Sequence, residues 1–240
     1  KVKKYREKNN KSILEGVRLI DESLNLNADI QGIWMTKDII NSNKDFIKKI
    51  KLHNVIFDII DNKDLERITD TKNSQGVIAE VNIKQYFISE FSKLITENII
   101  VLDNISDPGN IGNIFRTCAW YGIKSILLTS NTADAFNPKC LRAGMGAHFY
   151  FDHIITGDNK NIIDGLNKKK YNILCADLKG NKLSTLNIKN KWALIFGSEA
   201  HGLHRDFNHF SKVTINKIGD IESLNVSVAC GIILNQIKSK

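Results

Sequence analysis

The sequence predicts an α/β protein of two domains, a small amino-terminal one and a larger carboxyl-terminal one. Three observations lead to this prediction. The chain has 240 residues, enough for two domains that each bury a core. In its first part, short extended runs alternate with polar helical stretches. In its second part, the apolar runs are nearly continuous, which is typical of parallel strands covered on both faces.

The elements of the first domain are predicted to begin with a helix over residues 11–26, where apolar residues recur at helical spacing. The extended runs and helical stretches that follow are IQGIWM near Trp34, helical 44–51, VIFDII near Phe57, helical 64–70 and GVIAEV from Gly76. This order predicts a small α/β domain over residues 1–84. The polar and aromatic stretch 85–98 is predicted to be a linker.

The second domain is predicted over residues 99–240. Its strands are expected to begin at Ile99, Ser125, Tyr171, Trp192 and Lys212. Helices are expected to begin near Asn110, Asn137, Asn161 and Leu203, and a last helix is expected from Leu224 to the carboxyl terminus. The pattern predicts a mostly parallel sheet with helices between its strands.

The charge balance favours a polyanionic partner such as nucleic acid, because 34 Lys and Arg residues outnumber 26 Asp and Glu residues and give a net charge of +8. Candidate contacts are the amino-terminal basic run and the lysines Lys44, Lys48, Lys49 and Lys51, although a solvated helix face is the alternative for any single lysine. No apolar run is long enough to span a membrane, and the chain opens without the apolar stretch of a signal peptide. A cytosolic protein is expected.

The four cysteines are widely spaced, contain no CxxC pair and have small or apolar neighbours. They are predicted to be reduced core thiols rather than metal ligands or disulfides. His201, His204 and His209 lack the spacing of a zinc site and are expected to be surface residues. No metal is therefore expected.

Three loops of the second domain carry residues suited to chemistry. The first, DPGNIGNIFR, begins at Asp107 after the first strand. Pro108 and Gly109 predict a tight turn, and Asn110 is expected to cap the next helix. Arg116 lies nearly two turns along that helix, close to the same face. An amide beside a guanidinium at a strand's carboxyl end suits an oxygen-rich substrate, whereas the alternative is an ordinary surface helix.

The second loop, FGSEAHGL, closes the very apolar strand that begins at Trp192. Gly197 and Gly202 permit close backbone approaches that a side chain would block. Glu199 lies between them and is expected to orient a substrate or to pair with Arg116. A glycine turn with a solvated glutamate is the alternative.

The third segment, INKIGDIESLNVSVA from Ile215, is the most specific of the three. Ser223 is expected to cap the last helix. Asn225 and Ser227 then alternate with apolar residues at the start of that helix. Buried polar side chains are costly unless they form hydrogen bonds, so a ligand or a neighbouring loop is expected to satisfy them.

These segments resemble the three signature motifs of the SpoU/TrmH methyltransferases, a branch of the SPOUT superfamily. NxGxxxR, GSExxGL and SLNVSVA occur in the family's order, and the resemblance covers residues 99–238. More weakly, KYREKNNKSILEGVRL and ITDTKNSQGVIAEV resemble the RNA substrate-binding domain that many of these enzymes carry. The resemblance implies an S-adenosylmethionine-dependent RNA 2′-O-ribose methyltransferase without a metal, a trefoil knot in the carboxyl-terminal domain, and a homodimer.

The resemblance also implies roles for particular residues. Backbone contacts to the methyl donor are implied at Gly197, Ile215 and Leu224. The implied catalytic residues are Asn110, Arg116, Glu199, Ser223 and Asn225. Because a guanidinium stays protonated up to pH ~12, Arg116 is expected to hold the adjacent phosphate and stabilise the developing alkoxide rather than to remove the proton.

One departure from the family stands just before the third motif, where Asn216-Lys217 replaces the usual Pro-Met. Losing the proline loosens the loop that should clasp the donor, so a catalytically inactive RNA-binding protein of the same fold is an alternative. A dehydrogenase is disfavoured because the nearest match to the dinucleotide-binding fingerprint GxGxxG has Phe149 in place of the third glycine. No GxxxxGK[ST] phosphate loop is present, which disfavours an NTPase. Large-subunit ribosomal RNA is the expected target and tRNA the alternative, because the family's tRNA enzymes often lack this type of amino-terminal domain.

Overall fold

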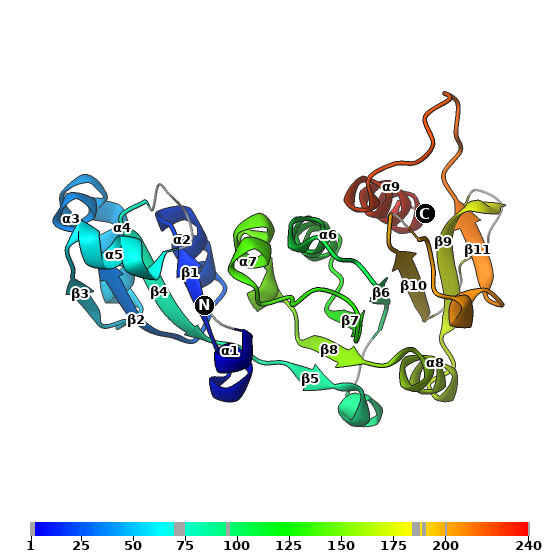
Figure 1. Cartoon of the computed structure of the whole chain (residues 1–240), viewed down its shortest axis with the longest axis horizontal. Helices are drawn as coiled ribbons and strands as arrows, with labels where there is room; N and C mark the ends of the chain where they lie inside the picture. The colour runs from blue at the N-terminus through cyan, green and yellow to red at the C-terminus, as the bar shows by residue number, and fades with distance from the viewer. Residues whose placement is uncertain are drawn as a thin grey trace. The chain divides into compact units, whose positions relative to one another are not determined.

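The computed structural model describes residues 3–69, 75–94, 97–183, 188, 191–199 and 201–239. By its contacts the chain divides into two compact units, each built on its own sheet (Figure 1). Unit 1 consists of Lys1–Lys84 and Asp134–Tyr150, and unit 2 of Gln85–Ala133 and Phe151–Lys240. The domain ranges given above stay a prediction.

Unit 1 contains a four-stranded sheet in the order β1-β4-β2-β3. Its strands are β1 (Lys11–Glu15), β2 (Ile30–Met35), β3 (Phe57–Ile59) and β4 (Val77–Asn82). Strands β1 and β2 run antiparallel to β4, whereas β3 runs parallel to β2. Its amino-terminal helices are α1 (Lys3–Asn9), α2 (Val17–Asn25), α3 (Lys37–Ser42), α4 (Lys44–Leu52) and α5 (Asn62–Ile68).

The single helix predicted over residues 11–26 is wrong in its first half. Residues Lys11–Glu15 form strand β1, and the helix α2 begins only at Val17. Gly16 separates the two elements with a φ of +98°, a conformation that side-chain-bearing residues rarely adopt. Leu14 is fully buried opposite Ala79 in the sheet. The few apolar residues before Gly16 fit both the helical and the strand period, and pairing with β4 decides in favour of a strand.

Residues 134–150 belong to unit 1, although they lie in the sequence between two strands of the sheet of unit 2, β7 (Ser125–Thr129) and β8 (His153–Gly157). They contain α7 (Pro138–Gly144) and the 3-10 helix η2 (Ala147–Tyr150). Arg142 forms an ion pair of 3.0 Å with Glu15, and the Ser12 hydroxyl donates to the Phe136 carbonyl over 2.9 Å. These contacts attach the segment to β1.

Unit 2 contains a seven-stranded sheet in the order β11-β9-β10-β6-β7-β8-β5, and every neighbouring pair is parallel. Its strands are β5 (Tyr86–Phe87), β6 (Ile99–Asp103), β7 (Ser125–Thr129), β8 (His153–Gly157), β9 (Asn172–Lys182), β10 (Trp192–Gly197) and β11 (Ser211–Thr214). The predicted mostly parallel sheet is confirmed. The sequence prediction missed β5 and β8.

Helices cover both faces of this sheet. They are α6 (Pro108–Trp120), α8 (Asn159–Lys168), α9 (Val226–Lys238) and the 3-10 helices η1 (Ile88–Lys93) and η4 (Arg205–Phe207). Figure 1 shows α6 and α9 on one side of the sheet and α8 on the other. Every residue of β6 and β7 is buried. The helix expected near Leu203 is only the single turn η4.

The stretch predicted as a linker contributes to the core of unit 2. Strand β5 pairs with the sheet edge at β8, and η1 follows it directly. Phe91 of η1 is 1% exposed and packs in the same apolar cluster as Ile99 and Leu166. None of the helices in the described ranges has the length and apolar character to cross a membrane. The trefoil knot implied by the resemblance stays a prediction.

The strand order brings the three chemistry-bearing loops to one edge of the sheet. Strand β6 lies between β7 and β10, and β9 lies between β10 and β11. Gly197, the last residue of β10, is in register with Asp103, the last residue of β6. The carboxyl ends of parallel strands all lie on the same side of the sheet, so the loops after β6, β10 and β11 meet there. Open α/β sheets bind ligands beyond the carboxyl ends of their strands.

Candidate active site

The first loop is organised by Asp107 rather than by Asn110. Asp107 is the N-cap of α6, and its carboxylate accepts from the Asn110 backbone N–H over 3.3 Å. Pro108 takes the first helical position, where its missing N–H costs nothing and its fixed φ suits the helix. The expected capping role of Asn110 is therefore wrong. As a consequence, the Asn110 side chain is available for contacts outside its own helix.

Asn110 and Asn225 join the three predicted motifs. The Asn110 amide donates to the Glu199 carboxylate, which lies in the second loop. The Asn225 amide donates over 3.0 Å to the side-chain oxygen of Asn110. One hydrogen-bonded chain thus connects loops that are separated by 89 and 115 positions in the sequence.

Asn225 also caps the last helix. Its side-chain oxygen accepts from the Ser227 backbone N–H over 2.9 Å and from the Ser227 hydroxyl over 2.6 Å. The expectation that Ser223 caps this helix is wrong, because α9 begins at Val226 and Asn225 is its N-cap. The side chains of Asn225 and Ser227 are therefore satisfied by each other and by Asn110, although Asn225 is exposed rather than buried.

Arg116 lies exposed on α6, and among the described residues no ion pair joins it to an acid. The expected pairing with Glu199 is not formed, because Glu199 accepts from Asn110 instead. The guanidinium therefore lies on the helix that carries Asn110 and faces solvent.

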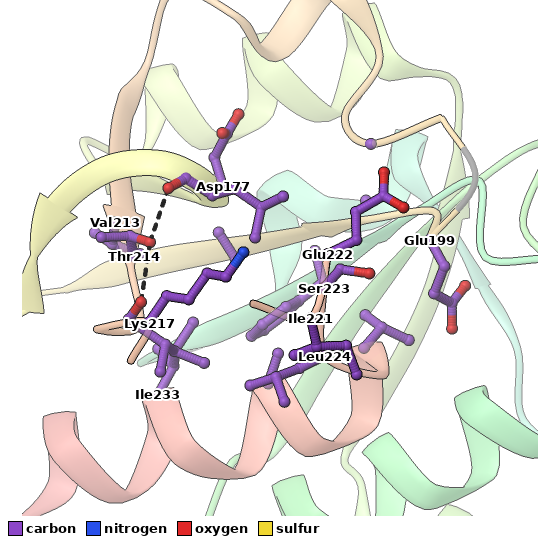
Figure 2. A pocket seen from close by; sticks show the side chains of 18 of the residues that line it. Asp177, Glu199, Val213, Thr214, Lys217, Ile221, Glu222, Ser223, Leu224 and Ile233 are labelled. Carbon is purple, nitrogen blue, oxygen red and sulfur yellow. Dashed lines mark hydrogen bonds between the residues drawn. The ribbon is translucent and has the colours of Figure 1, made fainter. Parts of the chain in front are cut away.

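A cavity of about 450 Å³ lies beside this chain of hydrogen bonds (Figure 2). Its walls come from the middle of β9, the end of β10 and the loop after it, the end of β11 and the loop that follows it, and the amino-terminal part of α9. All three residues expected to contact a methyl donor line it: Gly197, Ile215 and Leu224. Glu199 and Ser223 line it as well, whereas Asn110, Arg116 and Asn225 do not. Glu199 is the link between the cavity and the asparagine pair.

The loop after β10 is a tight glycine turn. The Gly202 N–H donates to the Ser198 carbonyl over 2.8 Å, and Gly202 has a φ of +66°. A side chain at Gly197 would collide with the backbone of Gly202 and Leu203. This confirms the close approach predicted from the two glycines. The turn holds Glu199 against the cavity.

Asp103 is a site residue that sequence reasoning missed. It is 1% exposed at the end of β6, and it accepts from the His204 backbone N–H over 2.7 Å. Burial raises the pKa of Asp103, and the hydrogen bonds from His204 and Thr129 offset part of that rise. Asp103 thereby fastens the loop that carries Glu199 to the neighbouring strand. An acid that ends an otherwise wholly apolar strand was the available signal.

The cavity is lined by three carboxylates and one ammonium group, which are those of Asp177, Glu199, Glu222 and Lys217. Asp177, midway along β9, forms an ion pair of 2.8 Å with Lys212. Burial alone would raise the pKa of Asp177, but the hydrogen bonds and charges of Lys212 and Lys179 together outweigh it and lower the pKa. Sequence reasoning did not single out Asp177 or Glu222.

Comparison with known proteins accords with this geometry. The model of the SpoU rRNA Methylase family matches residues 97–235, and the model described as RNA 2′-O ribose methyltransferase substrate binding matches residues 13–87. Together with the parallel sheet and the cavity at its edge, these matches define an RNA 2′-O-ribose methyltransferase. The chain belongs to the SpoU rRNA methylase family.

Individual relatives match over nearly the whole chain. The 23S rRNA (guanosine(2553)-2′-O)-methyltransferase RlmP of Bacillus subtilis is 28% identical, with 98% of this chain and 92% of the relative covered. The AdoMet-bound rRNA methyltransferase of Sinorhizobium meliloti is 24% identical, with a TM-score of 0.82 over 99% of this chain and 90% of its own. The SpoU methyltransferase AviRb of Streptomyces viridochromogenes, in complex with AdoMet, is 19% identical, with a TM-score of 0.84 over 100% and 93%.

Proposed function

We propose that the chain transfers a methyl group from S-adenosylmethionine to a ribose 2′-hydroxyl of large-subunit ribosomal RNA. The observation that carries the proposal is the hydrogen-bonded chain Asn225–Asn110–Glu199, which reaches the wall of the cavity at Glu199. It places one polar group from each signature motif beside a ligand-sized hollow. The relatives named for ribosomal RNA support this target over tRNA.

The residues that line the cavity fit the methyl donor. Its volume of about 450 Å³ lies within the range of pockets for small ligands and cofactors. Apolar side chains such as Leu178, Ile215 and Ile233 suit the flat adenine, and the Glu199 carboxylate suits a cationic sulfonium. Gly197, Ile215 and Leu224 would hold the donor. When bound, the donor supplies an already activated methyl group.

The protein's own residues then have to align and polarise the ribose. We assign Asn110 and Asn225 to orienting the ribose beside Glu199, whose carboxylate accepts from Asn110, while Asn225 donates to Asn110. Arg116 would bind the phosphate next to the target ribose and stabilise the negative charge that develops on the 2′-oxygen. Ser223, at the cavity wall, would contact the reacting group. These residues would orient the ribose hydroxyl towards the donor.

RNA recognition is assigned to unit 1. Of the four lysines on and beside α4, Lys49 pairs with Asp21 at 2.6 Å and Lys48 pairs with Asp45 at 3.0 Å. Lys44 and Lys51 are exposed and are the better candidates for phosphate contacts. In the amino-terminal basic run, Arg6 is 5% exposed and paired with Asp134, so it has a structural role instead.

We further propose a homodimer formed through the methyltransferase unit. Helices α6 and α9 pack against each other, and they carry exposed apolar side chains. Trp120 at the end of α6 is 85% exposed, and Val228 near the start of α9 is 49% exposed. Burying such side chains is a usual source of dimer stability. Sedimentation equilibrium of Trp120→Arg should then show a lower association constant than the wild type. The predicted cytosolic location stays a prediction.

Methyl transfer to separate RNAs tests the function directly. Purified chain, tritiated S-adenosylmethionine and either unmodified 23S-type rRNA or unmodified tRNA are incubated, and modified positions are mapped by resistance to alkaline hydrolysis. We expect one ribose-methylated position in the rRNA and none in tRNA. If only the tRNA became labelled, tRNA would replace ribosomal RNA as the proposed substrate. No label in either RNA, together with no heat of S-adenosylmethionine binding, would identify an inactive RNA-binding protein.

A further inference from the structure

The cavity contains two opposite charges for which the chain offers no partner among its described residues. Asp177 is already neutralised by Lys212 at 2.8 Å, and Glu199 accepts from Asn110. Lys217 and Glu222 also line the cavity, and Lys217 is the one cationic side chain among the described lining residues. Figure 2 shows the Lys217 side chain extending into the cavity. A ligand is the natural counterpart of both charges.

Both residues come from the loop between β11 and α9, five positions apart. Figure 1 shows this loop projecting away from the sheet, and the apolar Ile218 and Ile221 within it are 94% and 71% exposed. Lys217 and Glu222 are therefore both supplied to the cavity wall by one exposed segment.

We propose that Lys217 and Glu222 bind the amino-acid end of the methyl donor, with Lys217 on its carboxylate and Glu222 on its ammonium group. An ammonium and a carboxylate on one short segment complement the amino-acid end of the donor, a zwitterion whose own ammonium and carboxylate groups are attached to one carbon. An RNA phosphate fits less well, because Glu222 would repel it. The inference rests on the proposed use of S-adenosylmethionine.

Lys217 thus gives a function to the departure from the family pattern. A methionine at this position would supply only apolar contact, whereas the lysine adds a charge-assisted hydrogen bond to the donor carboxylate. The looser loop that follows from the missing proline is then held to the donor by the two charges.

The test compares two ligands that differ in the amino-acid end. S-adenosylhomocysteine has it, and 5′-methylthioadenosine lacks it. Isothermal titration of the full chain should show that Lys217→Met and Glu222→Gln each weaken S-adenosylhomocysteine binding about two- to fivefold, the range of exposed ion pairs. Binding of 5′-methylthioadenosine should not change. Lys168→Met, an exposed lysine of α8 outside the cavity, is the matched control and should affect neither ligand.

Salt provides a second measurement. Added sodium chloride should weaken S-adenosylhomocysteine binding more in the wild type than in Lys217→Met, because only the wild type has the ion pair to screen. Equal weakening of both ligands by Lys217→Met, or no weakening, overturns the inference while the methyltransferase assignment stands. A wild type that binds neither ligand overturns the donor assignment and this inference together. Circular dichroism melting confirms that the variants are folded.

Discussion

The Asn225 side-chain amide donates to the side-chain oxygen of Asn110 over 3.0 Å, which links the starts of α9 and α6. The other end of the same Asn225 side chain caps α9 through Ser227. One residue thus has a structural role through its oxygen and a proposed catalytic role through its nitrogen. Substitutions that alter only one of these atoms separate the two roles.

Asn225→Asp keeps the capping oxygen but loses the N–H that donates to Asn110. We expect its free energy of unfolding to stay close to that of the wild type, whereas Asn225→Ala should lose about 1 kcal/mol with the cap. Both variants should lose methyl transfer by at least about tenfold, because the ribose is no longer aligned. Denaturant unfolding and initial rates measure the two effects. An Asn225→Asp enzyme with wild-type rate would refute the proposed role of the amide.

Arg116→Ala should abolish methyl transfer, with a loss of at least about a hundredfold, as expected when a group that stabilises developing charge is removed. Its affinity for S-adenosylmethionine should stay unchanged, because Arg116 does not line the cavity. Arg116→Lys keeps the positive charge but lacks the planar guanidinium, so its methyl-transfer rate should lie between those of the wild type and Arg116→Ala. Single-turnover rates and isothermal titration measure these effects. Undiminished turnover in Arg116→Ala would defeat the assignment.

Asp103→Ala should loosen the loop that carries Glu199. It leaves the part-buried His204 N–H without its charged acceptor, at a cost of about 1–3 kcal/mol in the free energy of unfolding. Asp103→Asn keeps an oxygen acceptor and should retain most of the stability and the rate. If Asp103 took part in the chemistry through its charge, the asparagine variant would lose as much activity as the alanine variant. Comparing the two variants therefore separates positioning from charge.

His148 should make unit 1 less stable in mild acid. It is fully buried, its ring nitrogen Nε2 lies 2.8 Å from the Ala135 carbonyl, and burial lowers the pKa of His148 to about 4. The unfolded chain has the usual pKa near 6.5 and so binds more protons between pH 6.5 and 4. The contribution of neutral His148 to stability is therefore fully present above pH 6.5 and is lost as the pH falls towards 4.

The expected loss between pH 7.5 and pH 5 is about 2 kcal/mol for this one group. His148→Gln cannot titrate in this range and should show a smaller loss between the two pH values. Urea unfolding followed by circular dichroism measures the difference. A wild-type unfolding midpoint that does not change between pH 7.5 and pH 5 would contradict the depressed pKa.

Much of unit 2 could be predicted because its strands are buried on both faces. In β6, β7 and β10 the apolar runs have no competing interpretation, and the segment lengths exclude helices. The meeting of the three motifs at one sheet edge then follows from parallel topology. Strand β8 escaped prediction because Ile154 and Ile155 are its only strongly apolar residues, which is too few to show a period.

Other features depend on tertiary contacts that no local pattern contains. Pairing with β4 turned residues 11–15 into a strand. The capping residues were misplaced because neighbouring candidates, Asp107 and Asn110 or Ser223 and Asn225, have similar intrinsic preference, and the wider packing selects one. Asp103 was overlooked because its partner is a backbone N–H from a loop 101 positions away.

Because the segment 134–150 belongs to unit 1 but is flanked in the sequence by parts of unit 2, cutting the chain at one position cannot separate the two units. The backbone passes between them after Lys84, after Ala133 and again after Tyr150, so no one peptide bond divides the chain into self-sufficient halves. A carboxyl-terminal fragment starting at residue 99 would keep α7 but lose β1, which supplies Glu15 for Arg142. Such a fragment would expose the buried face of α7, which includes Cys140 and Leu141, and a shortened enzyme would have to be joined across positions 133 and 151 instead.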